Sequence, residues 1–337
     1  MEKEKLERIS HLSRLSRERN LTDEEIKERM ELRGQYIAEM KASLKHTLDN
    51  TYIQKPDGTR EKLRQKPNNQ KNQAINRKKP PIGGFFSRLF SKGGSFMDEN
   101  IQKLQQMIDE SPRIVFFGGA GVSTESGIPD FRSVDGLYNQ KFDYPPETIL
   151  SHSFFVSHTA EFYDFYRQKM ICLTARPNAA HRKLAELEAA GKLTAVITQN
   201  IDGLQQMAGS KKVLELHGSV HRNYCQKCHK CYSAEEILTT TGVPRCTCGG
   251  LIKPDVVLYE EQLDSETIDE SLNAITAADM LIIAGTSLTV YPAASLVHYF
   301  HGRYLVLINR DPTPMDDKTS LTLHGMVGEV LSQIIVR

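Results

Sequence analysis

The sequence predicts an α/β fold built on a doubly wound parallel sheet, and three observations carry that prediction. A short run of β-branched and aromatic residues at 113–116 precedes a glycine-rich stretch, as expected of a first strand and its ligand-binding turn. Two continuous apolar runs, 279–284 and 304–308, are typical of strands covered on both faces. Segments with helical periodicity alternate with these runs, which is the pattern of parallel sheets.

The remaining elements of the α/β region follow in order. A helix at about 99–109 leads into the first strand, and residues 134–180 hold several aromatics but no strong strand. We interpret 134–180 as a helical insertion that caps the ligand cleft. Further expected elements are a helix at 179–190, strands at 193–198 and 213–216, and a helix near 328–335.

Composition bounds the class of protein. The 337 residues are 39% hydrophobic and 25% charged, which is ordinary for a globular chain. Residues 1–96 carry 22 Lys and Arg against 13 Asp and Glu, whereas the rest carries 21 against 29. No apolar run approaches the roughly 20 residues of a membrane span, and the charged first residues lack the apolar core of a secretory signal. We therefore expect a cytoplasmic location.

Three regions are predicted. Residues 1–50 form a helical hairpin, since apolar residues recur three apart from Leu6 and Thr22 stands three before Glu25 as a capping box. Residues 51–96 are rich in Asn, Gln, Lys, Pro and Gly and are interpreted as a flexible basic linker. Residues 97–337 form the α/β domain.

Five of the six cysteines lie within 225–248, which favours a metal site over disulfides. The pattern Cys225-x-x-Cys228 followed by Cys246-x-Cys248 predicts a structural zinc site with four thiolates, in a module at about 219–252. Cys231 is the alternative ligand. A nucleic-acid-binding zinc ribbon is the rival interpretation, but the segment lacks a dense basic face.

Several motifs carry chemistry. Glycines 119 and 121 allow a sharp turn close to a ligand, a helix starting near Ser123 would face a phosphate, and Ile128–Arg132 adds a rigid turn and a guanidinium. Polar residues also follow later strands: Gln-Asn-Ile-Asp at 199–202, and His217-Gly218. The imidazole of His217 can act as a general base near neutral pH, whereas His221 is expected to be solvated.

These motifs resemble the sirtuin family of NAD-dependent protein deacylases, whose Gly-Ala-Gly-x-Ser and Gly-Ile-Pro-Asp-Phe-Arg signatures stand at 119–123 and 127–132. The resemblance covers about 97–337. It implies that His217 and Asn200 are catalytic, and that Val256 and Val257 contact an acyl-lysine peptide that pairs as a strand. The implied NAD contacts are Gly119, Ala120, Gly121, Thr124, Phe131, Arg132, Gln199, Ile201, Asp202, Gly285, Thr286, Ser287 and Asn309.

The implied function is that of an NAD-dependent protein lysine deacetylase, which transfers the acyl group to ADP-ribose and releases nicotinamide. Relatives that remove succinyl groups carry Tyr-x-x-Arg in the insertion, whereas here Tyr166 stands three after Tyr163 and Arg167 is one position off. We therefore expect acetyl or another uncharged acyl group. Mono-ADP-ribosyl transfer, NAD hydrolysis and a non-catalytic NAD-sensing scaffold are the alternatives.

Residues 1–65 resemble a small family of uncharacterised bacterial helical-hairpin proteins, through the region around Leu6–Ile9, the Leu-Thr-Asp-Glu-Glu turn and the run 41–56. That resemblance implies no known activity. Together with the basic segment, it suggests the hypothesis that this part of the chain binds an acidic partner such as nucleic acid or a ribosome.

Overall fold

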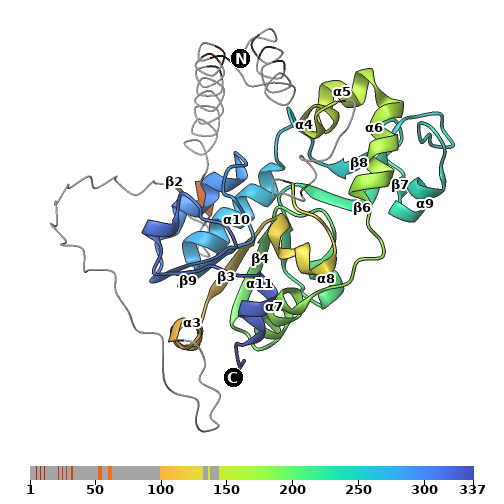
Figure 1. The fold of residues 1–337 in the computed structure, drawn as a ribbon. Helices are drawn as coiled ribbons and strands as arrows, with labels where there is room; N and C mark the ends of the chain where they lie inside the picture. Colours follow the sequence, from red (N-terminus) through yellow and green to blue (C-terminus); the bar gives the residue numbers. More distant parts are fainter. Residues whose placement is uncertain are drawn as a thin grey trace, which may run out of the picture.

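The computed structural model describes residues 99–131, 136 and 144–337, the backbone of 52–54 and 60–62, and residues 5, 8, 11, 22, 25, 28 and 32. Its centre is a parallel six-stranded sheet in the order β11-β10-β9-β3-β4-β5 (Figure 1). The strands are β3 (Ile114–Gly118), β4 (Leu193–Thr198), β5 (Val213–Glu215), β9 (Met280–Ala284), β10 (Tyr304–Ile308) and β11 (Leu321–Leu323). The doubly wound parallel sheet predicted from the sequence is confirmed.

Both faces of this sheet are covered by helices, because successive side chains of each strand point to opposite sides. Ile114 and Phe116 of β3 pack with α3, α7 and α11 on one face, and Val115 and Phe117 pack with α10 and η5 on the other. All four side chains are fully buried. The covering helices are α3 (Glu99–Glu110), α7 (Ala179–Ala189), α11 (Val327–Ser332), α10 (Ser265–Ala277) and the 3₁₀ helix η5 (Ala293–Tyr299).

A second, smaller lobe contains an antiparallel sheet in the order β7-β6-β8. Its strands are β6 (Gly218–Cys225), β7 (Cys231–Tyr232) and β8 (Ile252–Val256). The helices α4 (Pro146–Ile149), α5 (His152–Ser157), α6 (Thr159–Phe165) and α9 (Ala234–Thr239), with the π turn η4 (Tyr166–Met170), complete the lobe. They share a third hydrophobic core with this sheet, so the predicted insertion is helical in its described part.

The amino-terminal region is described only at scattered positions. Thr22 and Glu25 exchange the two hydrogen bonds of a capping box, with distances of 2.9 and 3.3 Å. Arg8 also forms a 2.7 Å ion pair with Glu28, and both residues are helical. The hairpin itself and its division at residue 50 stay predictions.

Two short strands fall where the sequence predicted only linker. β1 (Tyr52–Gln54) pairs antiparallel with β2 (Arg60–Lys62). The sequence Pro56-Asp57-Gly58 between them is typical of turns, and this local signal was outweighed by the polar composition of the segment. No helix in the described part of the chain has both the length and the apolar composition that a membrane crossing requires.

Candidate active site

The candidate site lies where the order of strands reverses. From the central strand β3 the chain proceeds outward to β4 and β5, and it then returns to β9 on the other side of β3. The loops after β3 and β9 therefore meet at the carboxyl edge of the sheet. In open α/β sheets this switch point is where ligands bind.

The glycine loop after β3 is shaped by its contact with the loop after β9. The N–H of Gly121 donates a 2.8 Å hydrogen bond to the carbonyl of Gly285. A Cβ at position 119 would lie 2.8 Å from Cβ of Thr286, and one at 121 would lie 2.8 Å from Cα of Gly285. These glycines are therefore required by close packing between the two loops, and not only by approach to a ligand as the sequence suggested.

The helix expected near Ser123 is absent from this described stretch. Two 3₁₀ turns, η1 (Ala120–Val122) and η2 (Thr124–Ser126), stand in its place. Gly127 then adopts a left-handed conformation with φ of 83°, and Pro129 disfavours helical geometry at the residue before it. The prediction of a helix was wrong because Gly127 and Pro129 end the helical conformation after two short turns.

Ser123 connects the glycine loop to the loop after β4. Its buried hydroxyl donates to Oδ2 of Asp202 at 2.6 Å and accepts from Nδ2 of Asn200 at 3.0 Å. Asp202 also accepts from the N–H of Leu204 at 2.9 Å, where α8 (Leu204–Ala208) begins. The amide of Asn200 and the carboxylate of Asp202 are thus fixed side by side. Ser123 stands in the motif, but the sequence analysis assigned it no contact.

His217 lies at the end of the next strand segment, after β5. Its Nδ1–H donates to the carbonyl of Gln199 at 2.9 Å, because a carbonyl can only accept. The other ring nitrogen, Nε2, is therefore the one able to take up a proton. Burial lowers the pKa of His217, and the hydrogen bond to Gln199 opposes that effect. The ring is accordingly neutral at pH 7, as a general base must be.

The predicted substrate strand lies directly beside His217. β8 is at the edge of the small sheet, and the N–H of Val257 donates to the carbonyl of His217 at 3.0 Å. Val256 is buried in the core of the small lobe, and Phe131 and Ile201 pack against the same cluster. An edge strand next to a candidate base is a geometry that an extended peptide can use by strand addition.

The other predicted cofactor residues mostly gather at the same edge of the sheet. Gln199 donates from Nε2 to Oγ1 of Thr286 at 3.2 Å, so the loops after β4 and β9 are joined. Thr124 donates to the carbonyl of Gly121 at 3.0 Å, within the glycine loop. Ser287 follows β9 and Asn309 follows β10. Ala120 lies in the turn η1, and Arg132 lies outside the described residues.

Two residues at the start of α7, which the sequence analysis did not single out, support the glycine loop. Asn178 donates from Nδ2 to the carbonyl of Val122 at 2.7 Å, and its Oδ1 caps α7. His181 completes that capping box through Nδ1, and its fully buried ring has a pKa lowered to about 4 by burial. The spacing of Asn178 and His181 before an apolar helix is the signal that could have identified them.

His221 was expected to be solvated, and the structure shows otherwise. Its Nε2 lies 3.0 Å from the carbonyl of Asp202, and the ring is half-buried. From the sequence, His221 was placed in the metal module alone. Its contact with the loop after β4 joins two distant segments, and no local sequence pattern predicts it.

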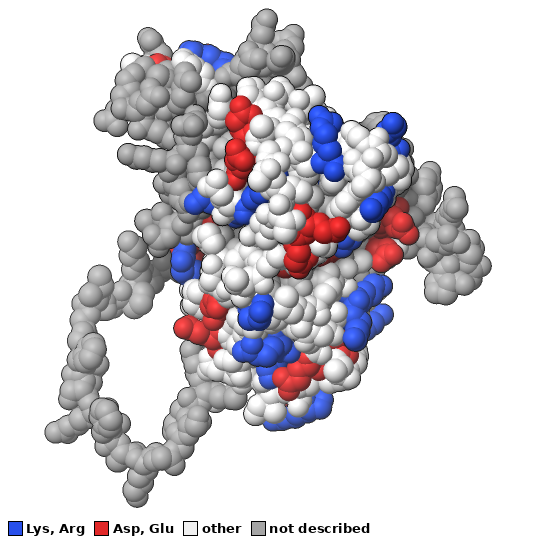
Figure 2. Space-filling model, turned by 90° about the vertical axis from the view of Figure 1, so that its right-hand side faces the viewer, with Lys and Arg blue, Asp and Glu red and all other residues white. Residues whose placement is uncertain are grey.

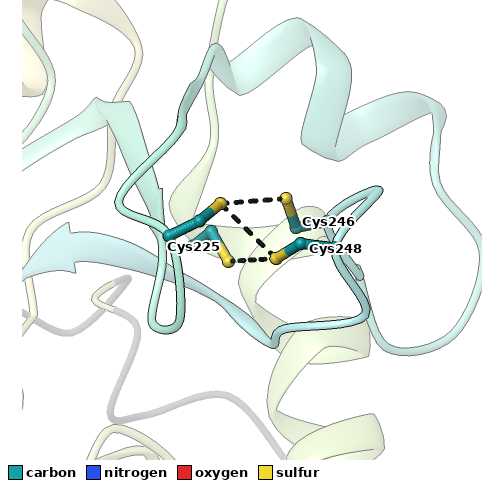
Figure 3. A group of neighbouring side chains, drawn as sticks. Cys225, Cys246 and Cys248 are labelled. Atoms are coloured by element: carbon teal, nitrogen blue, oxygen red, sulfur yellow. Dashed lines mark hydrogen bonds between the residues drawn. The ribbon is translucent and has the colours of Figure 1, made fainter.

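The four predicted thiol ligands converge in the small lobe (Figure 3). Their Sγ atoms all lie within 4.8 Å of one another, with separations of 3.5 Å for Cys225–Cys248, 3.5 Å for Cys228–Cys246 and 3.4 Å for Cys228–Cys248. Four thiolates around zinc with bonds of about 2.3 Å require sulfur separations of roughly 3.8 Å. The four cysteines therefore fit a zinc ion, whereas Cys231 lies outside this group in β7.

The surface on this side of the molecule does not favour nucleic acid. Figure 2 views the side on which α9 and β7 lie in Figure 1, and there Lys and Arg are interspersed with Asp and Glu. A backbone-binding ribbon requires clustered positive charge.

Comparison with known proteins agrees with this geometry. A model of the Sir2 family matches residues 119–292. The chain belongs to the Sir2 family. A curated relative from Clostridium perfringens, named NAD-dependent protein deacetylase, is 57% identical over 71% of this chain and 100% of its own length. One of the same name from Clostridium acetobutylicum is 56% identical over 70% of this chain and 98% of its own.

Solved Sir2 structures share the fold. A Sir2–p53 peptide–NAD+ structure is 41% identical, covers 68% of this chain and 95% of its own, and superposes with a TM-score of 0.61. A Sir2 structure bound to a propionylated peptide gives 40% identity, 68% and 95% coverage, and a TM-score of 0.62.

The Sir2 match leaves the amino-terminal region outside it. Residues 4–64 match a family described as "Bacterial protein of unknown function (DUF896)". That match includes β1 and β2, which the sequence analysis had placed in the linker. The chain thus joins a Sir2-family region to a segment of a second family.

Proposed function

We propose that this chain is an NAD-dependent protein lysine deacetylase with His217 as its general base. The observation that carries the proposal is the placement of His217. Its Nδ1–H donates to the carbonyl of Gln199, and its own carbonyl accepts from the N–H of Val257. Val256 and Val257, at the end of β8, form the edge at which we expect a peptide to pair, called the peptide edge below. The base thus lies between the polar loop after β4 and an edge strand. Curated relatives named NAD-dependent protein deacetylase support the same activity.

NAD would be held at the switch point of the sheet. Asn200 and Asp202, fixed by Ser123, offer an amide and a carboxylate that suit the carboxamide of nicotinamide. The loops that carry Thr286 and Asn309 would hold the ribose and adenine end. When bound, NAD supplies the ADP-ribose that takes the acyl group as nicotinamide leaves. His217 would then accept a proton at Nε2 from a ribose hydroxyl.

The acyl group that we propose is uncharged. The hydroxyl of Tyr163 donates to the carbonyl of Ile252, and Arg167 donates to Oγ1 of Thr240 at 2.9 Å and to the carbonyl of Ile237 at 3.2 Å. Both side chains are thus engaged within the small lobe. A succinyl carboxylate would have to break these contacts, whereas an acetyl group would not.

The decisive experiment mixes the full-length chain, NAD and a panel of acyl-lysine peptides, and identifies the products by mass spectrometry. We expect one nicotinamide released for each acetyl-lysine converted, with succinyl-lysine slower. Nicotinamide release without peptide conversion would instead indicate NAD hydrolysis. ADP-ribose attached to the protein or peptide would indicate ADP-ribosyl transfer. If no product formed at all, the non-catalytic scaffold would be the remaining alternative.

The amino-terminal region and the location complete the proposal. We infer that residues 1–96, with 22 Lys and Arg against 13 Asp and Glu, bring the enzyme to an acidic partner such as nucleic acid or a ribosome. Such binding must weaken as salt is raised, and binding insensitive to salt would contradict it.

A cytoplasmic location is proposed from cysteine usage, because the described cysteines are free and four of them form a metal-type cluster.

A further inference from the structure

A histidine of the small lobe reaches the loop that carries Asp202. His221 lies on β6, and its Nε2–H donates to the main-chain carbonyl of Asp202 at 3.0 Å. Because a carbonyl oxygen can only accept, this contact fixes the proton on Nε2. The bond acts on the backbone of Asp202, while Ser123 and Leu204 hold its carboxylate.

The same loop is packed against the imidazole ring. Gly203 has φ of 70°, in the left-handed region, and a Cβ there would lie 2.7 Å from Cδ2 of His221. Position 203 is therefore restricted to glycine by both its backbone and the ring beside it. One residue earlier on β6, the N–H of Val220 donates to the carbonyl of Ile201 at 2.9 Å. Residues 201–203 are thus tied to β6 at consecutive positions.

β6 also joins the two ends of the site. It begins at Gly218, directly after the proposed base His217, and ends at Cys225, a proposed zinc ligand. Gly218 pairs with Val256 of β8, and a Cβ at position 218 would collide with the carbonyl of Asp255, so this end of the strand lies close against β8. His221 lies halfway along this strand, where the pairing with β8 is interrupted between Ser219 and Asn223, and its ring contacts residues 202 and 203.

We propose that His221 is a positioning residue for the nicotinamide end of the NAD site. The inference rests on the proposed function, in which Asp202 contacts nicotinamide. By holding the carbonyl of Asp202, His221 sets the direction in which the carboxylate of that residue projects toward Ser123. The hydrogen bond of the His221 side chain goes to Asp202 and not to His217 or Val256. Its loss should therefore change the affinity for NAD and leave the affinity for the peptide unchanged.

The test compares His221→Phe with His221→Gln in the full-length chain. Phenylalanine keeps a planar ring and removes the donor, whereas the Nε2 of glutamine can replace the donor of the imidazole. We expect His221→Phe to raise the Kd and KM for NAD about tenfold, the size of effect given by the loss of one hydrogen bond. We also expect a weaker inhibition by nicotinamide, an unchanged peptide KM and full zinc content. His221→Gln should recover most of the NAD affinity.

The controls separate this inference from the proposed function. His301→Phe, at an exposed position, should leave every parameter unchanged. Calorimetric binding of NAD needs no turnover, so it decides the role of His221 even if the wild-type chain deacetylates nothing. Unchanged NAD affinity in His221→Phe, equal losses in both variants, or a wild-type chain that binds no NAD would each overturn the inference.

Discussion

Ser123 donates a 2.6 Å hydrogen bond to the carboxylate of Asp202, which is 79 positions further along the chain. This contact joins the loops after β3 and β4, the first two strands of the sheet. The same hydroxyl accepts from the amide of Asn200, so a single buried atom sets the orientation of two proposed NAD contacts. The glycine loop is thus connected to the residues that we propose for the nicotinamide end of NAD.

Replacement of Ser123 by alanine should therefore weaken the binding of NAD without unfolding the protein. Hydrogen bonds to a charged group contribute about 1.5–3 kcal/mol, which corresponds to roughly a 10- to 100-fold loss in kcat/KM for NAD. Ser126→Ala is the matched control, because the buried hydroxyl of Ser126 makes no hydrogen bond in the described structure. Equal kinetics for the two variants would show that the Ser123 bond does not position the pocket.

The pH dependence of turnover should report the burial of His217. Burial lowers the pKa of this ring below its ordinary value of 6.5. A general base loses activity as pH falls through its pKa, so the acidic limb of kcat/KM should lie below pH 6.5. His217→Tyr should abolish turnover and keep its zinc. An acidic limb above pH 6.5, or activity in that variant, would assign the base elsewhere.

Zinc content should depend on Cys228 and not on Cys231. Cys228→Ser removes one of the four converging thiols, so we expect loss of bound zinc and of ordered structure in the small lobe. Cys231→Ser leaves the cluster complete and should retain one zinc per chain. Metal analysis and circular dichroism of both variants test this directly. A loss of zinc in Cys231→Ser alone would exchange the two assignments.

Local patterns were sufficient to predict the parallel sheet and the four converging thiols. The apolar runs of β9 and β10 identify strands buried on both faces, and the cysteine spacing selects the four thiols that meet. Both signals lie within short stretches of sequence. They therefore need no knowledge of which segments become neighbours in the folded chain.

Contacts between distant segments were beyond such patterns. The packing of Gly121 on Gly285 and the bond from His221 to Asp202 depend on how the loops approach one another. The pairing of β1 with β2 was missed for a different reason, since a polar composition concealed two short strands. For the two loop contacts the missing information was tertiary, whereas for β1 and β2 a local turn signal was present and was outweighed by composition.

Arg222 offers a test of how firmly the two lobes are joined. It donates from Nη1 to Glu215 of β5 at 2.8 Å and from Nε to Asp255 of β8 at 2.7 Å, so it links the two sheets on either side of His217. The side chain of Glu215 is only 10% exposed, and its carboxylate would lose its charged partner. We expect Arg222→Met to lower the free energy of unfolding by about 1–2 kcal/mol. Arg113→Met is the matched control, because Arg113 also binds a carboxylate with two hydrogen bonds, to Asp279, but is 57% exposed.

The control should lose less than about 1 kcal/mol, as exposed ion pairs do. Urea unfolding followed by far-ultraviolet circular dichroism measures both variants, and this signal suits a chain without tryptophan. Glu215 lies two residues before His217, and Asp255 lies next to Val256 on β8. Arg222→Met should therefore also raise the KM for the acyl peptide, whereas Arg113→Met should not. Similar losses in both variants would mean that solvent screens the Arg222 pairs and that other contacts hold the lobes together.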